Sequence, residues 1–329
     1  MFGLTNFFAA EESSQITWSA AAPLPYRVQE IYPVVHQGKI YVAGGLSPDV
    51  PEQQMNISDQ VWAYDPELDR WVAAPSLPEP RHHPFLVSYE NAIYAFGGFI
   101  ARDGGRWHNS SDVLRLVDGG SSWEKIGSMP SPQAETLAVV LKQKIHLASG
   151  RSPRGSQNAR WGDQIDVAGH QIYDPTTGSW APAPALDVAR NSASGVRLGG
   201  AWHVIAGRTV AGGNLPTHEL YDPEANSWTL KAPLPQAQGG LAAAALHGKI
   251  YVFGGEYFDN GGGVYEEVWE YTPQTDRWRH VSDMPVPRHG LGAVTLGHAI
   301  YVVGGATEAG GAGTSNRVSV FTLTEASSP

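Results

Sequence analysis

The chain has 329 residues, 42% of them apolar, which is enough for one large β domain. Its net charge of −10 and its isoelectric point near 5.6 argue against nucleic acid or an anionic membrane as the main partner. It contains no cysteine, which excludes disulfides, thiolate metal sites and a cysteine nucleophile.

The first residues predict an N-terminal extension over 1–15. The stretch MFGLTNFFAAEESS is apolar but has neither a basic region nor a long apolar core, so we expect no signal peptide. The compartment stays open: a cytoplasmic location is favoured, and export is the alternative if a leader sequence precedes this one.

The phrase GKIYVAGGL at 38–46 returns with variation five more times along the chain. Its last glycine and a tryptophan both recur in steps of 53, 52, 57, 48 and 50 residues. A fixed period near fifty residues indicates a repeat architecture. The two series are Gly45, Gly98, Gly150, Gly207, Gly255 and Gly305, and Trp18, Trp71, Trp123, Trp180, Trp228 and Trp278.

Each period predicts four short strands. An alternating apolar strand leads through a short turn to the apolar run that ends in the glycine motif. A variable loop, a third strand such as 60–65, a turn such as YDPELDRW at 64–71 and a strand that opens on the tryptophan follow. No window shows helical periodicity. Four antiparallel strands per fifty residues are typical of a propeller blade, with blade cores near 31–74, 83–126, 136–183, 193–231, 241–281 and 291–323.

The two ends of the repeat region predict how the ring closes. The sixth glycine motif has no tryptophan after it, and Trp18 has no glycine motif before it. We therefore expect 16–21 to be the outer strand of the last blade, which would leave one propeller over 16–323 without an exposed sheet edge and a C-terminal tail over 324–329.

These motifs resemble the kelch family over nearly all of 16–323. The resemblance rests on the glycine pair, the tyrosine before the Asp-Pro turn and the tryptophan, in a spaced set of six. It implies an all-β, six-bladed kelch β-propeller with four antiparallel strands per blade. It implies little about function, because propellers support enzymes, binding modules and scaffolds alike.

The long loops after the glycine motifs and the segments that enter the inner strands share one face, where we expect the functional site. Four arginines in the entering segments predict a ring of guanidinium groups at the channel mouth, suited to a carboxylate or phosphate. The alternative is that they only bond carbonyl groups of the blades. The four are Arg27, Arg81, Arg190 and Arg288.

Further polar and aromatic residues are expected at the same mouth. Titratable and amide groups beside the arginines are Glu30, His82, His83, Glu135, Asn191 and His289. Charged residues directly after glycine motifs are Arg151, Arg208 and Glu256. Aromatic residues that could stack on a sugar ring or pack within the loops are Trp107, Trp161, Tyr257 and Phe258.

This inventory favours an enzyme that binds a small anionic molecule, most plausibly an acidic carbohydrate. Glu256, Glu30 or Glu135 could act as base and a neighbouring histidine as acid, in an epimerase, mutarotase or lyase. The arrangement loosely resembles that of kelch sialic acid epimerases, which place a Glu and an Arg at the channel mouth. We expect neither a cofactor nor a metal, and galactose oxidase chemistry is excluded because its crosslink needs a cysteine.

The competing interpretation is a non-catalytic module that binds an acidic peptide or protein partner at the same mouth. Either way the sequence favours a monomer, without a nucleic-acid or membrane partner.

Overall fold

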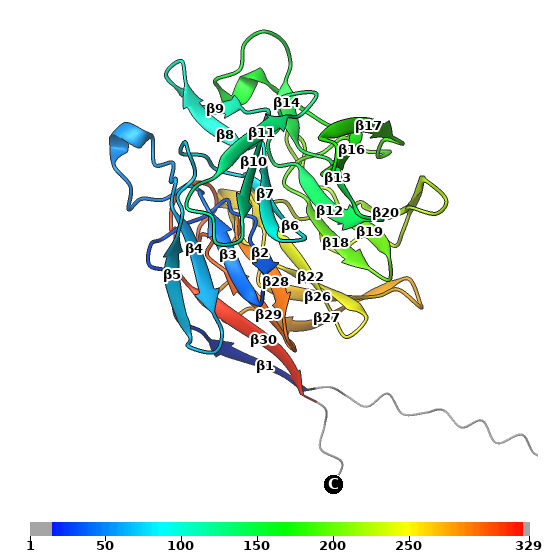
Figure 1. The fold of residues 1–329 in the computed structure, drawn as a ribbon. Coiled ribbons are helices and arrows are strands. Elements are labelled where there is room, and N and C mark those ends of the chain that lie inside the picture. Colours follow the sequence, from blue (N-terminus) through cyan, green and yellow to red (C-terminus); the bar gives the residue numbers. More distant parts are fainter. Residues whose placement is uncertain (1–14, 325–329) are drawn as a thin grey trace, which may run out of the picture.

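The computed structural model describes residues 15–324, and it shows six four-stranded antiparallel sheets arranged as the blades of one propeller (Figure 1). This confirms the predicted all-β fold and its blade count. The expected N-terminal extension and C-terminal tail lie outside the described residues, apart from Gln15 and Thr324. Within 15–324, no helix is long and apolar enough to cross a membrane.

The blades follow the chain in order. The first three consist of β2 (Val34–His36), β3 (Lys39–Ala43), β4 (Val61–Asp65) and β5 (Arg70–Ala74); β6 (Phe85–Tyr89), β7 (Ala92–Phe96), β10 (Asp112–Val117) and β11 (Glu124–Ser128); and β12 (Leu137–Leu141), β13 (Lys144–Ala148), β16 (His170–Asp174) and β17 (Ser179–Ala183). The last three consist of β18 (Ser194–Leu198), β19 (Ala201–Ile205), β20 (His218–Asp222) and β21 (Ser227–Leu230); β22 (Ala242–Leu246), β23 (Lys249–Phe253), β26 (Glu267–Thr272) and β27 (Arg277–Asp283); and β28 (Gly292–Leu296), β29 (Ala299–Val303), β30 (Val318–Thr324) and β1 (Gln15–Ala20).

The ring closes as predicted. Strand β1 pairs antiparallel with β30 as the outer strand of the last blade, with Trp18 opposite Phe321. In Figure 1 the first and last strands lie side by side, blue against red. Closure leaves the last blade with the same four strands as the other five and joins the two ends of the chain.

Three of the loops that follow the glycine motifs contain ordered structure that the sequence did not predict. They form the hairpins β8 (Phe99–Arg102) with β9 (Gly105–Asn109), β14 (Arg151–Pro153) with β15 (Gln164–Asp166), and β24 (Glu256–Tyr257) with β25 (Gly263–Val264). Short 3-10 helices lie at η1 (Glu52–Gln54), η2 (Trp161–Asp163) and η3 (Asp259–Gly261). The hairpins fix the side chains that surround the channel.

The glycine motif ends each second strand in the left-handed region. Gly45 has φ +95°, and a Cβ there would lie 2.4 Å from Val28 Cγ2 and 2.8 Å from the carbonyl oxygen of Gln29. A side chain would therefore push apart the segment that enters the inner strand, in addition to the cost of the backbone conformation. The glycine repeats because, in each blade, the end of the second strand packs closely against the segment that enters an inner strand.

Four of the repeated tryptophans tie their blade to the one before it by the same hydrogen bond. The indole nitrogen of Trp71 donates to the carbonyl of Ala22, 2.8 Å away, and that of Trp123 donates to Pro75 at the same distance. Trp228 and Trp278 repeat this bond to Pro184 and Ala232. Each ring thus fills the gap between two blades and satisfies its polar atom there.

Two blades carry a buried histidine pair where others carry tyrosine and valine. Nδ1 of His146 lies 2.9 Å from Nε2 of His170, and His203 and His218 repeat the contact at 2.9 Å. Burial lowers the pKa of His146 and of His170 to about 4. It lowers the pKa of His203 to about 4 and, helped by His203, that of His218 to about 3. All four rings are therefore neutral near pH 7.

Candidate functional site

One backbone position per blade brings the chain close to the same position of the neighbouring blade. These positions repeat in the same steps as the glycine motif, and all have positive φ: Glu30, His83, Glu135, Ser192, Gly240 and Gly290. Backbone hydrogen bonds join neighbouring members, such as Glu30 N to Gly290 O at 2.6 Å and Gly240 N to Ser192 O at 2.9 Å. We call these six residues the axial ring.

The residues after the glycine motifs are brought against this ring by short bridges. Ala134 pairs with Arg151, Asn191 with Arg208 and Gly239 with Glu256, each between the segment that enters an inner strand and the loop that leaves the second strand. A repeating bridge of this kind places the charged residues of blades three, four and five beside the axial ring.

Glu30 ends a chain of hydrogen bonds. Its Oε2 lies 2.7 Å from Nε2 of His83, whose Nδ1 lies 2.7 Å from Nδ1 of His82. Nε2 of His82 lies 2.8 Å from the carbonyl of Arg106 and must donate to it. Burial, and then the charge of His83, hold the pKa of His82 well below its ordinary value, so His82 is neutral and its Nδ1 accepts.

His83 therefore donates from both ring nitrogens, to His82 and to Glu30, and carries a positive charge. Burial alone would raise the pKa of Glu30, but the charge and hydrogen bond of His83 outweigh burial and hold that pKa below its ordinary value. Glu30 is thus a carboxylate at neutral pH, and its second oxygen, Oε1, lies 3.9 Å from Nδ1 of His289.

Glu135 is buried within the cluster. Its Oε1 is 3.1 Å from Nε of Arg151, and its Oε2 accepts from the hydroxyl of Ser192 at 2.6 Å. Nη2 of Arg151 donates to Oδ1 of Asn191 at 2.9 Å. Burial alone would raise the pKa of Glu135, but Arg151 and His83 lower it below its ordinary value. This carboxylate is fully enclosed and holds Arg151 in place.

Glu256 and Arg208 form the next pair. Nη1 of Arg208 donates to Oε1 of Glu256 at 2.5 Å, and the backbone N–H of Gly310 donates to Oε2 at 2.7 Å. Burial alone would lower the pKa of Arg208, but Glu256 and Glu135 raise it. Nδ1 of His289 lies 3.4 Å from Oε2 of Glu256, and neither nitrogen of this buried ring has a hydrogen-bond partner among the described residues.

The cluster balances its own charges. Three carboxylates, of Glu30, Glu135 and Glu256, face three cations, and His289 is left between two of the carboxylates. The cations are His83, Arg151 and Arg208. Buried charges persist only when paired in this way.

A cavity of about 700 Å³ opens above the cluster, on the face of the long loops. Glu30, Glu256 and Arg208 line its floor. Aromatic and cationic side chains form its walls, and these are Arg106, Trp107, Trp161, Tyr257, Phe258 and Tyr265. Arg106 forms no ion pair with any residue in 15–324. The volume falls within the range of about 300–1,000 Å³ usual for small-molecule sites.

Comparisons with known proteins agree with this architecture. The family model of the kelch motif matches residues 33–78 and 239–285. Kelch-like protein 35 of Mus musculus is 29% identical over 176 residues, which are 54% of this chain and 26% of that protein. The chain is a kelch-repeat β-propeller.

Other relatives extend the likeness without assigning an activity. Kelch-like protein terF of Aspergillus terreus is 26% identical over 204 residues, 60% of this chain and 42% of that protein. The kelch propeller thus spans less than half the length of these curated relatives. The solved structure titled "Structure of YjhT" matches with a TM-score of 0.75 over 93% of this chain and 97% of that one, at 16% identity. At that identity the match shows the fold alone.

The predicted ring of guanidinium groups at the mouth of the kelch propeller does not form. Arg81, Arg190 and Arg288 are buried inside their own blades. Arg288, for example, donates to the carbonyls of Gly304 and Val302 at 2.7 and 3.2 Å. These three arginines donate hydrogen bonds to carbonyl groups of the blades, as the alternative expectation states. They point away from the axis because the chain turns toward it only two residues later, at the axial ring.

Arg27 was placed one residue out of register. The spacing of the repeats makes Val28 the equivalent of Arg81, and Arg27 is about half exposed and paired with Asp49. The structure brings the other predicted site residues together in or around the cluster and its cavity. These are Glu30, His82, His83, Glu135, Arg151, Asn191, Arg208, Glu256, His289, Trp107 and Tyr257.

Several residues of the site escaped the sequence prediction. Ser192, Gly240 and Gly290 share the axial register with Glu30, and the repeat spacing could have identified them. Arg106 lies on β9, and Asn214, whose Nδ2 donates to the carbonyl of Glu256 at 2.7 Å, lies in the loop before β20; neither follows the repeat, so no sequence signal identifies them. Within residues 15–324, no group of three or more His, Asp or Glu side chains is arranged to hold a metal ion.

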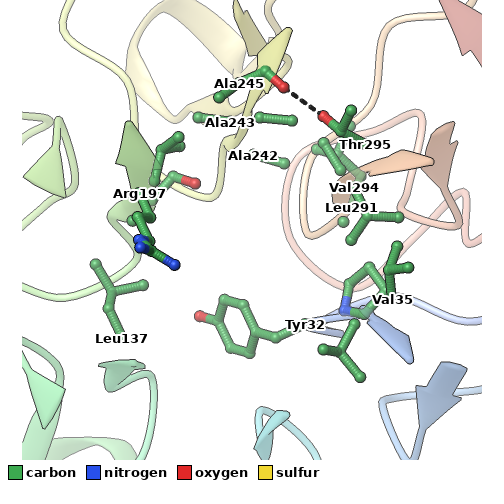
Figure 2. A pocket seen from close by; sticks show the side chains of 18 of the residues that line it. Tyr32, Val35, Leu137, Arg197, Ala242, Ala243, Ala245, Leu291, Val294 and Thr295 are labelled. Carbon is green, nitrogen blue, oxygen red and sulfur yellow. Dashed lines mark hydrogen bonds between the residues drawn. The ribbon is translucent and has the colours of Figure 1, made fainter. Parts of the chain in front are cut away.

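A second cavity lies farther along the inner strands. This cavity of about 360 Å³ is lined mainly by small apolar side chains of β18, β22 and β28. Figure 2 shows Tyr32 lying across it from the first blade, with Arg197 as a charged side chain at the opposite wall. None of the predicted site residues lines it, whereas Glu30, Arg208 and Glu256 line the cavity on the loop face.

Proposed function

We propose that the kelch propeller binds a small acidic carbohydrate in the 700 Å³ cavity and isomerises it by proton transfer. One observation carries the proposal: a closed cluster of carboxylates, imidazoles and guanidinium groups forms the floor of an aromatic-lined cavity. Epimerisation, mutarotation and β-elimination all need a base, a proton carrier and a cation for developing negative charge.

Glu30 is the base that the geometry favours. One of its oxygens is held by His83, the other lies 3.9 Å from Nδ1 of His289, and Glu30 lines the cavity. Both oxygens of Glu256, in contrast, accept hydrogen bonds from Arg208 and Gly310. The lowered pKa keeps Glu30 deprotonated throughout the neutral range, at the cost of some base strength.

His289 would move the proton between the two carboxylates. Its Nδ1 lies 3.4 Å from Glu256 and 3.9 Å from Glu30, and it has no competing partner among the described residues. A proton taken up at Glu30 can thus pass to Nδ1 of His289, and the same nitrogen can hand it to Glu256, which returns it to the substrate once Gly310 gives up its hydrogen bond. The reaction is then an isomerisation in which no proton is gained or lost overall.

Two arginines would bind the acidic group of the sugar. Arg208 lines the cavity with its side chain 13% exposed, and Arg106 lines the same cavity without an ion pair in 15–324. Guanidinium groups suit a planar carboxylate. Trp107, Tyr257 and Phe258 supply flat apolar surfaces for the ring of the sugar.

The test is turnover and binding measured on the same variants. Galacturonic, glucuronic and N-acetylneuraminic acids are incubated with the protein, and anomer exchange, deuterium uptake from solvent and double-bond formation are followed by NMR. Glu30→Gln should lower turnover by roughly 10²-fold or more while binding stays within a few-fold. Glu224→Gln, which removes an exposed carboxylate paired with Lys142, is the matched control and should change neither.

Unchanged turnover in Glu30→Gln would remove that residue from the role of base. Stabilisation of the protein by acidic peptides alone, with no response to any sugar, would favour the competing binding module.

A further inference from the structure

A second cavity adjoins the first on the loop face. It measures about 570 Å³ and shares Arg106, Trp107 and Trp161 with the central cavity. Its other walls come from the η1 region of the first blade, around Met55, and from the loop that ends in Arg160. The shared side chains form the boundary between the cavities, so the central site continues outward between the loops of blades one, two and three.

The walls of this outer groove are fixed by hydrogen bonds between two blades. The backbone N–H of Trp107 donates to the carbonyl of Ala159 at 3.1 Å, and Nε2 of Gln164 donates to the carbonyl of Trp107 at 2.9 Å. A Cβ at Gly105 would lie 2.0 Å from the Ala159 carbonyl oxygen, so glycine allows this close approach. A preformed groove costs less ordering when a ligand binds.

Trp161 is held as a platform at the boundary. The guanidinium of the buried Arg151 lies 3.4 Å from the centre of its ring, and Trp107 meets it edge-on at 4.9 Å. Its side chain nevertheless stays 39% exposed. A large aromatic ring supported on one face and open on the other is well suited to the apolar face of a sugar ring.

The charges beside Trp161 favour an acidic ligand. Arg106 lines both cavities and Arg160 lines the outer groove, and neither forms an ion pair within the described part of the chain. Glu52 is the carboxylate among the lining residues of the outer groove. Arg106 and Arg160 thus line the same groove as the exposed Trp161, on a protein whose net charge is −10.

We propose that the outer groove binds further units of an acidic oligosaccharide whose terminal unit occupies the central cavity. The inference rests on the proposed function and extends it from a monosaccharide to a chain. The central cavity alone lies within the range of roughly 300–1,000 Å³ usual for a small molecule, and the adjoining outer groove offers further open surface for additional sugar units.

The test compares monomers with trimers by isothermal titration. The probes are galacturonate with trigalacturonate, and N-acetylneuraminate with its α2,8-linked trimer. For the sugar that fits, wild type should bind the trimer at least tenfold more tightly than the monomer. Arg160→Glu, which changes a side chain lining only the outer groove, should remove this advantage and leave monomer affinity within twofold.

Phe258→Ala is the matched aromatic control, because Phe258 is exposed and lines only the central cavity. It should weaken monomer and trimer equally, whereas Trp161→Ala should weaken the trimer more. Equal affinity of wild type for monomer and trimer, or an unchanged ratio in Arg160→Glu, would overturn the groove while leaving the proposed function intact. Failure of every monomer and trimer to bind would overturn both.

Discussion

The paired histidines of the third and fourth blades predict where acid destabilises the propeller. In the fifth blade the positions equivalent to His146 and His170 are Tyr251 and Val268. The double variant His146→Tyr/His170→Val therefore gives the third blade the pair that the fold already uses elsewhere. It removes two titrating groups from the interior and keeps the strand positions apolar or aromatic.

The sign follows from the lowered pKa values. Both histidines have a pKa of about 4 in the folded protein, against 6.5 ordinarily. Below about pH 6.5 these histidines bind protons in the unfolded chain but not in the folded protein, so the free energy of unfolding falls as the pH falls toward 4. Each histidine therefore lowers the free energy of unfolding by roughly 2 kcal/mol between about pH 7 and pH 5, and the pair lowers it by about 4 kcal/mol.

The assay is denaturant unfolding at pH 7 and at pH 5, followed by tryptophan fluorescence. The quantity compared is the loss of unfolding free energy between the two pH values, which cancels any packing cost of the new side chains. The double variant should lose about 4 kcal/mol less than wild type. His280→Gln, at an exposed histidine, should change the loss by less than about 0.5 kcal/mol. Equal losses in the double variant and wild type would refute the argument.

Three further changes test the fold and the cluster. Arg288→Ala should destabilise the propeller by roughly 3 kcal/mol or more, because the carbonyls of Gly304 and Val302 lose a buried donor. Sugar affinity should stay unchanged, and loss of binding without loss of stability would return Arg288 to the site. Gly45→Ala should lower the melting temperature, since its Cβ would meet Val28 at 2.4 Å, and an unchanged melting curve would contradict the close approach. Glu135→Gln should be less stable than wild type at neutral pH, because the lowered pKa of Glu135 means that its carboxylate stabilises the fold. As the pH falls below 4.5 the variant should lose less unfolding free energy than wild type, and parallel pH profiles would contradict the pairing with Arg151.

The fold could be predicted because its signals are local. Gly45 marks a backbone conformation and a close approach, and Trp71 fills the gap between two blades, so each motif reports its own surroundings wherever it recurs. Closure followed from the one tryptophan left without a glycine motif, Trp18. Residue types at a fixed spacing were sufficient for these features.

The site was predicted only in part because it depends on the direction of side chains. Arg81 and His83 are two residues apart, yet one is buried within the blade and the other lies on the axis, because the backbone changes to positive φ at His83. Composition around the glycine motif did identify Arg151, Arg208 and Glu256, whose bridges place them beside the axial ring. Arg106 follows no repeat, and only the folded hairpin of β8 and β9 brings it to the cavity.

The most direct test of the account is whether the central cavity prefers an acidic sugar. Isothermal titration would compare each acid of the panel with its neutral counterpart, such as galacturonate with galactose, on wild type and on Arg106→Met. The account predicts that one acid binds at least tenfold more tightly than its neutral counterpart and that Arg106→Met reduces this preference. Equal binding of acid and neutral sugar, or no binding of any acid, would contradict it.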